Sequence, residues 1–489
     1  MNTLRTADRD EVTHSEVQAI LNDVVGFDIN PVAVIACRVN YLVTLGDLAA
    51  LGPITLPVWR ADSIRVPSAP PAQTTADNPR LAGRPYKELS TSLPDPFPIP
   101  QPLATAEGMA GLRRILEAAL EREVQEDGVN ELEAALEAYA DPMDQNPLGL
   151  NPNGWQELLD VTTELYIQLW TLKRDGRNGV WVRIIENSFA PLFENRFDVV
   201  VGNPPWVTWT RLPEQWRAAT QPLWERYGLW KIPRESGGGP RSLASTDMAT
   251  IVFAVALERY LKPHGVIGLL TPESLIRGDP GGRAFRRFHL KSDDASIDDP
   301  VSVPFRIRHV DDWTQIGPFQ PDASNNPVFL VGQREETHQP PVPTVKWERV
   351  TSGLRLESSW SKVRPQLRPV SGVCNPVDRS VPSSAWSFQP EGAPALIEGG
   401  SNVWQFGKGF DTRGANGIYF VKVVVPVSAA GKVRIENIPS AGRNPSVRTT
   451  QGFVEAALVY PLLRGRDVDH WIASPSGYVL GACRAIMPR

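Results

Sequence analysis

The sequence is poor in the residues that build disulfide frameworks and metal centres. Its 489 residues include three cysteines, Cys37, Cys374 and Cys483, which are far apart and odd in number. Such a set forms neither a disulfide framework nor a metal-ligand pattern, and it fits a reducing cytosol. The six histidines show no metal-ligand or catalytic-triad spacing. We therefore expect no metal site and interpret the histidines as structural.

Long apolar runs are also absent. No stretch approaches the roughly 18 residues of a membrane span, and the polar N-terminus has no hydrophobic segment of a signal peptide. A hydrophobic content of 42% and a charged content of 21% are ordinary for a soluble globular protein. We expect a cytoplasmic protein with no membrane partner, long enough for roughly two to four domains.

No strong net charge marks the chain as a whole, but its charge is unevenly distributed. The formal net charge is −5. Residues 401–489 hold eleven Lys and Arg against five Asp and Glu, which makes this segment +6 and leaves −11 for residues 1–400. A basic segment on an acidic body fits a polyanionic partner such as DNA. An ordinary solvated surface explains the same charges equally well.

The first third of the chain combines an α/β pattern with a helical insertion. The stretch 24–28 resembles a short buried strand that ends in an acid, and Pro31 opens a helical run. A second apolar stretch at 54–64 completes a strand–helix–strand alternation. The proline-rich stretch 66–103 predicts an extended surface connector. Helical spacing of apolar residues follows at 105–140 and 155–174.

The α/β pattern then returns. Residues 197–202 predict a buried strand, and 245–265 predict a helix that is stopped by Pro263 and Gly265. Another strand should follow from 266, and an antiparallel pair should lie near 305–332. We therefore predict five segments: a partial α/β core at 1–65, a proline-rich connector with helical insertion at 66–180, the main α/β core at 181–335, a connecting region at 336–400 and a mainly β module at 401–489.

The stretch FDVVVGNPPWV at 197–207 carries the clearest chemical signal. Two prolines directly after a strand fix the backbone, and ligands of α/β sheets bind outside the carboxyl ends of strands. An exocyclic amine of a nucleobase is a poor nucleophile, because its lone pair is delocalised into the ring. The Asn203 side-chain oxygen and the Pro204 carbonyl can accept both N–H bonds and stabilise the developing charge. A tight structural turn with Trp206 as a core aromatic is the plainer interpretation.

This motif resembles the Asn-Pro-Pro-aromatic catalytic motif of amino-methyltransferases that use S-adenosylmethionine. More narrowly, the chain resembles the large adenine-specific (N-6) DNA methyltransferases of restriction–modification and phage-defence systems, with the motif order of their gamma class. The resemblance implies a Rossmann-like α/β fold and a double-stranded DNA partner. It assigns Asn203, Pro204, Pro205 and Trp206 to catalysis, with Trp206 stacking on a flipped-out base.

The same resemblance extends over roughly residues 24–480 and assigns further roles. GFDINPVAV at 26–34 resembles the acidic motif that binds the ribose of the methyl donor, which makes Asp28 a donor ligand. ADSI at 61–64 places Asp62 near the adenine of the donor, and Asp247 corresponds to an acid near the donor. A strand-end helix cap, a solvated turn and a helix cap are the respective structural alternatives for these three acids.

Two later stretches resemble the opening of a DNA target-recognition domain. They are GKGFDTRGANGIYFV at 407–421 and PLLRGRDVDHW at 461–471. The resemblance implies DNA contacts by Arg413, Asn416, Arg464 and Arg466. A structural ion-pair network is the alternative for Arg464 and Arg466.

One motif of the family is missing from this sequence. The family has a strand and a Gly-rich turn ahead of the Asp28 motif, where they cradle the methionine part of the donor. Only 27 residues precede Asp28, and none of the first 25 is glycine. We expect a sheet without its central first strand, a chain that is the interior piece of a longer protein, and weak or no donor binding. A second polypeptide or an upstream segment would then supply the motif.

Three alternatives to DNA adenine methylation remain. Methylation of an RNA amine or a protein glutamine uses a similar Asn-Pro-Pro-aromatic loop. A non-catalytic DNA-binding remnant fits the missing Gly-rich motif. Nuclease activity is weaker, because no carboxylate–lysine cluster for metal-dependent cleavage is apparent.

Overall fold

The computed structural model divides the chain into two compact units, Met1–Gly399 and Gly400–Arg489. The structure describes residues 13–65, 81–89, 93, 95–140, 148, 150–177, 180–193, 196–232, 241–242, 246–278, 281–292, 300–319, 326–350, 359–392, 412, 414–426, 430–442, 444–469 and 472–481.

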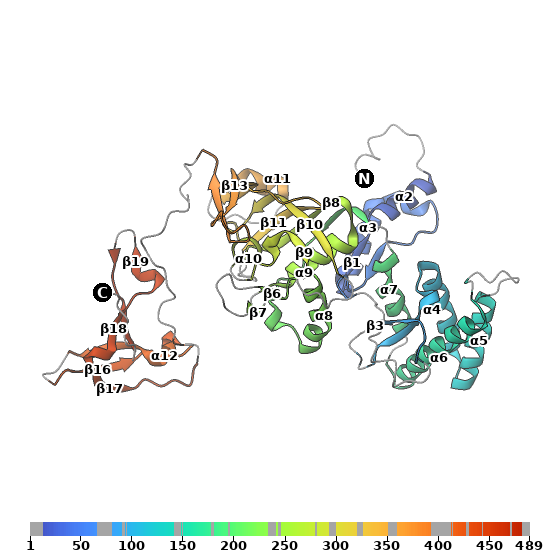
Figure 1. Ribbon diagram of the computed structural model, residues 1–489, viewed down its shortest axis with the longest axis horizontal. Helices are drawn as coiled ribbons and strands as arrows, with labels where there is room; N and C mark the ends of the chain where they lie inside the picture. The colour runs from blue at the N-terminus through green and yellow to red at the C-terminus, as the bar shows by residue number, and fades with distance from the viewer. Residues whose placement is uncertain are drawn as a thin grey trace. The chain divides into compact units, whose positions relative to one another are not determined.

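A mixed eight-stranded sheet forms the centre of the first unit (Figure 1). Its strand order is β14-β13-β12-β10-β11-β8-β5, and β9 pairs with β10. The strands are β5 (Phe197–Gly202), β8 (Leu261–Pro272), β9 (His289–Lys291), β10 (Ser302–Asp312), β11 (Pro327–Arg334), β12 (Val342–Arg349), β13 (Leu367–Pro376) and β14 (Trp386–Pro390). The expected antiparallel pair near 305–332 is confirmed as β10 and β11.

The segment before β8 differs from the sequence prediction. The α-helix α9 covers Met248–Val255 and continues as a π-helical turn over Ala256–Tyr260. The helix therefore ends before Pro263, and β8 already begins at Leu261. The pairing of β8 with β5 is irregular between Leu261 and Val266, so the proline lies where the ladder is interrupted.

The segment 336–400, predicted as a connecting region, contributes three strands to the same sheet. Strand β12 pairs in parallel with β10, and β13 and β14 follow as antiparallel neighbours. The prediction was wrong here because short strands separated by turns do not indicate which sheet they join.

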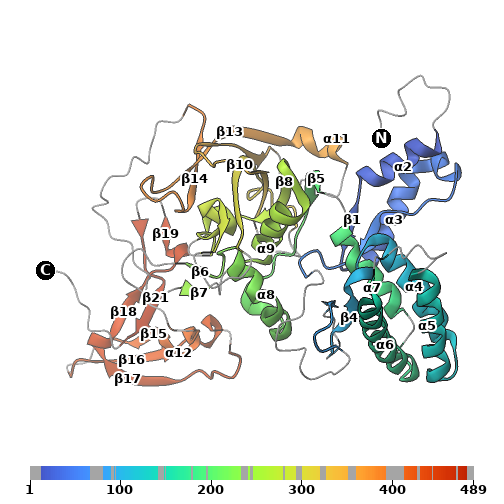
Figure 2. The ribbon, with the colours of Figure 1, turned by 45° about the vertical axis from the view of Figure 1, so that its right-hand side comes forward.

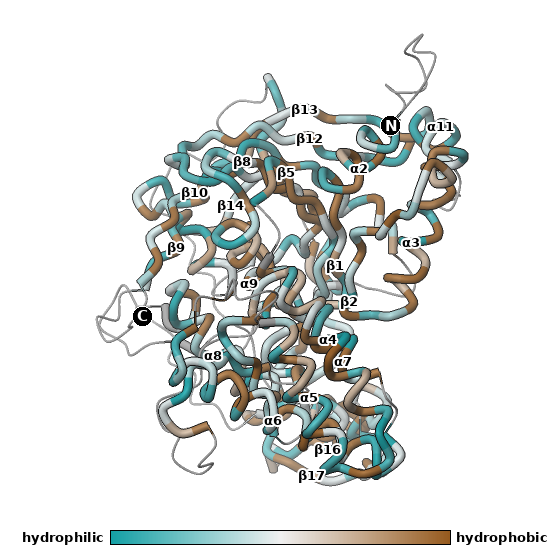
Figure 3. Tube along the Cα trace, turned by 90° about the vertical axis from the view of Figure 1, so that its right-hand side faces the viewer, coloured by the Kyte–Doolittle hydropathy of each residue, from teal (hydrophilic) through white to brown (hydrophobic). Residues whose placement is uncertain are grey.

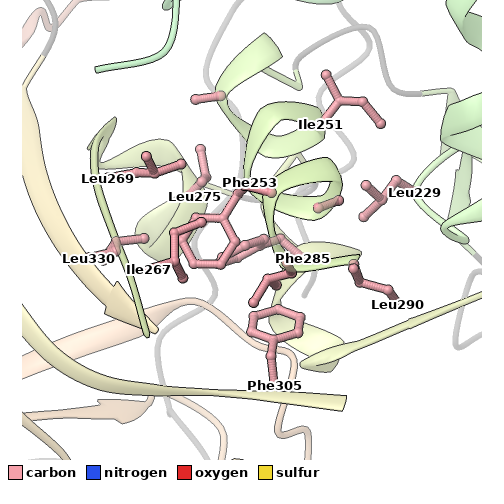
Figure 4. Close-up of a cluster of buried hydrophobic side chains, with 14 of the residues drawn as sticks. Leu229, Ile251, Phe253, Ile267, Leu269, Leu275, Phe285, Leu290, Phe305 and Leu330 are labelled. Atoms are coloured by element: carbon pink, nitrogen blue, oxygen red, sulfur yellow. The ribbon is translucent and has the colours of Figure 1, made fainter. Parts of the chain in front are cut away.

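Buried apolar side chains from both faces of α9 and from the sheet form the main core. Phe253 of α9 lies edge-on to Phe285 at 5.1 Å and next to Phe305 of β10. Figure 4 shows these rings packed with Ile267, Leu269 and other aliphatic side chains. The core fixes β8 and α9, which flank the Asn-Pro-Pro-Trp segment.

Helices α4 to α7 form a separate bundle with its own core (Figure 2). They are α4 (Ala106–Glu121), α5 (Gln125–Ala140), α6 (Pro152–Arg174) and α7 (Trp181–Phe193). Part of the predicted surface connector belongs to this core: β3 (Tyr86–Leu89) pairs with β4 (Phe97–Pro100), and all four residues of β4 are buried. A two-stranded hairpin tolerates the prolines of β4, because its outer edge needs no N–H donor.

The N-terminal part contains helix α2 (His14–Asp23) and a two-stranded parallel sheet joined by helix α3 (Pro31–Leu45). The strands are β1 (Gly26–Asp28) and β2 (Val58–Arg60). Pro31 opens α3 as predicted, and the Asn30 side chain caps it by accepting a hydrogen bond from the Val32 N–H.

The stretch Pro31–Ala50 is long and apolar enough to cross a membrane by length and composition, and most of it is exposed. This corrects the expectation that no stretch approaches that length. The apolar run is interrupted by Arg38, Asn40 and Asp47, so it does not stand out as one continuous stretch in the sequence. Figure 3 shows the hydrophobic residues along α3.

The remaining elements of the first unit are short. They are α8 (Glu214–Arg226), β6 (Lys231–Ile232), β7 (Arg241–Ser242), α10 (Ser274–Arg277) and α11 (Trp360–Val363).

The second unit is an antiparallel sheet with the order β17-β16-β15-β21-β18. Its elements are α12 (Asn416–Tyr419), β15 (Phe420–Val425), β16 (Lys432–Asn437), β17 (Gln451–Glu455), β18 (Val459–Leu462) and β21 (Gly477–Leu480), with a small hairpin of β19 (Val468–Asp469) and β20 (Ile472–Ala473). Its buried core consists of Val421, Val433 and Ile435.

Candidate active site

Asn203 directly follows β5, at the carboxyl end of a strand that pairs in parallel with β8. The side chain of Asn203 is exposed, whereas the next residue, Pro204, is buried. The amide of Asn203 has no hydrogen-bond partner among the described residues. The segment therefore presents a free carboxamide on a proline-fixed backbone.

Trp206 is held at the same end of the sheet. Its indole N–H donates to the Leu270 carbonyl of β8 at 3.2 Å. Phe319 lies edge-on to its ring, with centroids 5.4 Å apart and planes at 85°. Phe319 is 37% exposed, and the half-buried Trp206 ring packs against the main core. Sequence reasoning missed Phe319, because it lies more than a hundred residues away in a loop without a motif.

Two backbone hydrogen bonds hold Asp247 against the segment that follows Trp206. The Met248 N–H donates to the Val207 carbonyl at 2.9 Å, and the Trp209 N–H donates to the Thr246 carbonyl at 3.0 Å. Asp247 is buried, and the Ser274 hydroxyl donates to its carboxylate at 2.8 Å. Burial raises the pKa of Asp247, although the hydrogen bond from Ser274 opposes this.

An ion pair connects helix α10, which begins at Ser274, to the end of β10, just before the loop that carries Phe319. Arg277 of α10 donates to the buried Asp312 at the end of β10 and to Glu273 at 2.9 Å. Asp312 also accepts hydrogen bonds from Thr314, which begins the loop leading to Phe319. Burial opposes ionisation of Asp312, but the bonds from Thr314 and Arg277 outweigh it and lower its pKa.

The two other predicted donor ligands lie elsewhere. Asp28 accepts a hydrogen bond from the Asn30 N–H at 2.7 Å, and Asp62 accepts from the N–H groups of Ile64 and Arg65. Each carboxylate therefore stabilises its own turn, and the cap of α3 is Asn30 rather than Asp28.

The contacts of Tyr260 locate this pair of acids. Its hydroxyl donates to the Ser63 carbonyl at 2.7 Å, and its ring stacks on Phe27 at 6.0 Å. Tyr260 directly precedes Leu261, the residue opposite Phe197 at the start of β5. Asp247 is thus held against the segment that follows Trp206, whereas Asp28 and Asp62 belong to segments that contact Tyr260, just before β8.

The predicted DNA contacts in the second unit are only partly described. Arg413 and the side chain of Arg466 lie outside the described residues. Asn416 begins α12 and accepts a hydrogen bond from Thr412. The guanidinium of Arg464 lies over the Phe420 ring at 5.5 Å. No group of three or more potential metal ligands occurs among the described residues.

Comparison with known proteins places the chain in a family. Residues 22–299 match the model of the Eco57I restriction-modification methylases. The match includes Asp28, Asp62, the Asn-Pro-Pro-Trp segment and Asp247. No significant match exists among curated proteins.

Several solved structures are similar at low identity. A modification subunit of a putative type I restriction enzyme from Vibrio vulnificus is 14% identical with a TM-score of 0.20, covering 48% of this chain and 43% of that one. The M protein of the type I restriction enzyme EcoKI is 9% identical with a TM-score of 0.21, covering 60% and 63%. The type IIG restriction endonuclease BpuSI is 14% identical with a TM-score of 0.23, covering 54% and 30%. The chain thus spans less than two thirds of each of these solved chains.

Proposed function

Because the chain belongs to the Eco57I restriction-modification methylase family, we propose that it methylates the exocyclic amine of adenine in double-stranded DNA. S-adenosylmethionine is the methyl donor of this proposal. The observation that carries it is the exposed Asn203 carboxamide, which has no partner among the described residues and lies three residues before Trp206 at the carboxyl end of a parallel strand pair.

The residues around Asn203 suit an exocyclic amine whose nitrogen becomes pyramidal, so that its N–H bonds leave the plane of the base. The Asn203 side-chain oxygen and the Pro204 carbonyl are two acceptors in adjacent positions, and the prolines keep the backbone between them rigid. Accepting both N–H bonds stabilises positive charge on the nitrogen as its lone pair becomes available. Such a base must first leave the duplex.

The rings of Trp206 and Phe319 support base binding. Trp206 is oriented through its N–H bond to Leu270, and Phe319 is held by the loop that begins at Asp312 and Thr314. An aromatic ring stacked on a flipped base contributes about 1–3 kcal/mol. We assign Phe319 to the same base-binding surface as Trp206.

Donor binding, by contrast, requires a rearrangement or a further segment. One edge of β5 pairs with β8, and no described strand pairs with its other edge. Val199 and Val201 on that strand are 60% and 73% exposed. We propose that an additional strand, parallel to β5 and supplied by another segment or polypeptide, covers this edge and lets Asp28 and Asp62 approach the donor.

Transfer of a labelled methyl group tests this function. The chain, together with candidate partner segments, is incubated with labelled S-adenosylmethionine and either duplex DNA, RNA or protein substrate. We expect label on DNA adenine alone. Asn203→Ala should reduce transfer to background while duplex retention in a filter or mobility assay stays unchanged. Label on RNA or on protein glutamine would contradict the proposal.

A non-catalytic role in DNA binding is the second candidate, because Asp28 and Asp62 accept hydrogen bonds of their own turns and the sequence lacks the Gly-rich donor motif. It predicts salt-sensitive duplex binding without transfer, even when a partner restores donor binding. The same assay separates the two functions.

A further inference from the structure

The first unit contains a cavity whose lining does not include Asn203. Its volume is about 980 Å³, at the upper end of the range for small-molecule sites. The lining contains three arginines and two histidines, namely Arg286, Arg287, Arg379, His289 and His338. Five prolines contribute to the same lining, and no described lining residue is a carboxylate.

The pairing register places this cavity at the far end of the sheet. Pro304 of β10 lines it, and the carbonyl of Pro304 accepts a hydrogen bond from the Glu335 N–H just after β11. Asp312, eight residues further along β10, pairs with Val328 at the end where Phe319 and Trp206 meet. Eight residues of strand are about 26 Å, so the cavity is distinct from the candidate active site.

The cationic side chains are fixed by neutral acceptors. Arg286 is buried and donates to the carbonyls of Ser383 at 2.9 Å, Leu275 at 3.0 Å and Gly278 at 2.9 Å. These bonds tie the turn after β13 to α10 and hold one wall of the cavity in place.

Arg379 lies on that turn and is exposed. The adjacent Asp378 carboxylate accepts from the N–H and the hydroxyl of Ser380 at 2.9 and 2.6 Å. It therefore stabilises its own turn, and the Arg379 guanidinium has no partner among the described residues.

His338 adds a neutral donor to the lining. Its Nδ1 accepts a hydrogen bond from the Ile307 N–H at 3.3 Å, so the proton of the neutral ring is on Nε2. Nε2 is buried and has no hydrogen-bond partner among the described residues. Burial, with repulsion from Arg306, lowers the pKa of His338 to about 4. A buried unsatisfied donor costs about 1–3 kcal/mol, which an anionic oxygen would recover.

The backbone beside the cavity is strained in two places. Phe288 has φ of 52° and Glu335 has φ of 59°, a region that costs a non-glycine residue of order 1–3 kcal/mol. The Phe288 ring stacks on His338 with centroids 3.6 Å apart. The strained residue thus fixes the imidazole that lines the cavity.

We propose that this cavity binds a phosphate ester, through the Arg379 guanidinium and the Nε2–H of His338. Guanidinium groups match phosphate oxygens in charge and in fork geometry. The prolines keep the lining rigid, so little conformational freedom is lost on binding. The phosphate comes either from a free nucleotide or from the backbone of DNA, and the site does not depend on methyl transfer.

Calorimetric titration of the full chain with ATP, with inorganic phosphate and with a short DNA duplex tests this proposal. Arg379→Glu should raise the Kd of the bound phosphate ligand by at least about 10-fold, in line with one lost charged hydrogen bond. The matched control is Arg368→Glu, because Arg368 is 69% exposed and lies at the other end of β13. It should leave the Kd of that ligand unchanged.

His338→Phe keeps a ring on Phe288 but removes the Nε2 donor, and it should also raise the Kd. If the Kd for ATP or inorganic phosphate rises with Arg379→Glu and not with the control Arg368→Glu, the source is a free nucleotide or phosphate. A response seen only with the duplex identifies the DNA backbone. Equal behaviour of Arg379→Glu and Arg368→Glu with all three probes would overturn the proposal.

Discussion

At the scale of single residues, the candidate active site depends on side chains with few internal partners. The Asn203 carboxamide is free among the described residues, whereas Trp206, Asp247 and Asp312 are each held by a specific hydrogen bond. A group that must bind substrate gains from remaining unpaired, and its neighbours gain from being fixed.

Phe319 provides a residue-scale test of the base-binding surface. Phe319→Ala removes a partly exposed ring beside Trp206, and loss of about 1–3 kcal/mol of stacking should lower methyl transfer by roughly 10- to 100-fold. Fluorescence of 2-aminopurine at the target position, which rises when the base leaves the stack, measures the same loss. Phe319→Tyr should retain most of the activity. Unchanged transfer by Phe319→Ala would exclude the ring from base binding.

His338 provides a residue-scale test of stability against pH. Its pKa is about 4 in the folded chain and 6.5 in the unfolded chain, so the unfolded state binds more protons between these values. Stability should therefore fall as the pH drops from 6.5 to 4, by at most about 3 kcal/mol from this residue. Thermal unfolding of His338→Phe should lose less stability over this range than the unsubstituted chain. Parallel losses in both would contradict the prediction.

At the scale of elements, β5 combines two environments. One edge is paired with β8, and Val200 packs on the main core, whereas Val199 and Val201 project from the opposite face and are exposed, so β5 is not the buried strand that the sequence predicts. Helix α3 likewise exposes Val32, Ile35, Val39 and Val43 along one side. Exposed valine and isoleucine in such numbers are unusual for interior elements of an α/β fold.

Two substitutions in neighbouring strands test whether the face of β5 that carries Val199 and Val201 is uncovered in the isolated chain. Val201→Thr should change the free energy of unfolding by no more than about 0.5 kcal/mol, because the side chain is already exposed. Ile267→Ala, in the buried partner strand β8, should cost about 2–5 kcal/mol. Urea unfolding measures both. A large loss of unfolding free energy for Val201→Thr would mean that this face of β5 is packed.

At the scale of the whole molecule, the donor site is the part that is not assembled. Asp28 and Asp62 accept hydrogen bonds within their own turns, whereas Asp247 is held against the segment that follows Trp206. The strand and Gly-rich turn that cradle the donor in the family are also missing from this sequence.

The isolated chain should therefore bind S-adenosylmethionine more weakly than micromolar, or not at all, in a calorimetric titration. Asp28→Ala should then leave the titration with S-adenosylmethionine unchanged, because the Asp28 carboxylate stabilises only its own turn. After addition of a segment that completes the sheet, Asp28→Ala should weaken binding. Micromolar binding by the isolated chain would contradict this view of the donor site.

The sequence by itself determined the local features with a strong physical signature. The apolar run before Asn203, the start of α3 at Pro31 and the helices of the bundle follow from side-chain periodicity and from the fixed φ of proline. The family followed from the Asn-Pro-Pro-Trp motif. These features depend on residues close together in the chain.

Only the tertiary structure decided which distant residues meet. It placed β12, β13 and β14 in the main sheet, buried the proline-rich strand β4, and brought Phe319 to Trp206. Strand order and loop placement depend on packing between segments far apart in sequence, and local propensity carries no information about that packing.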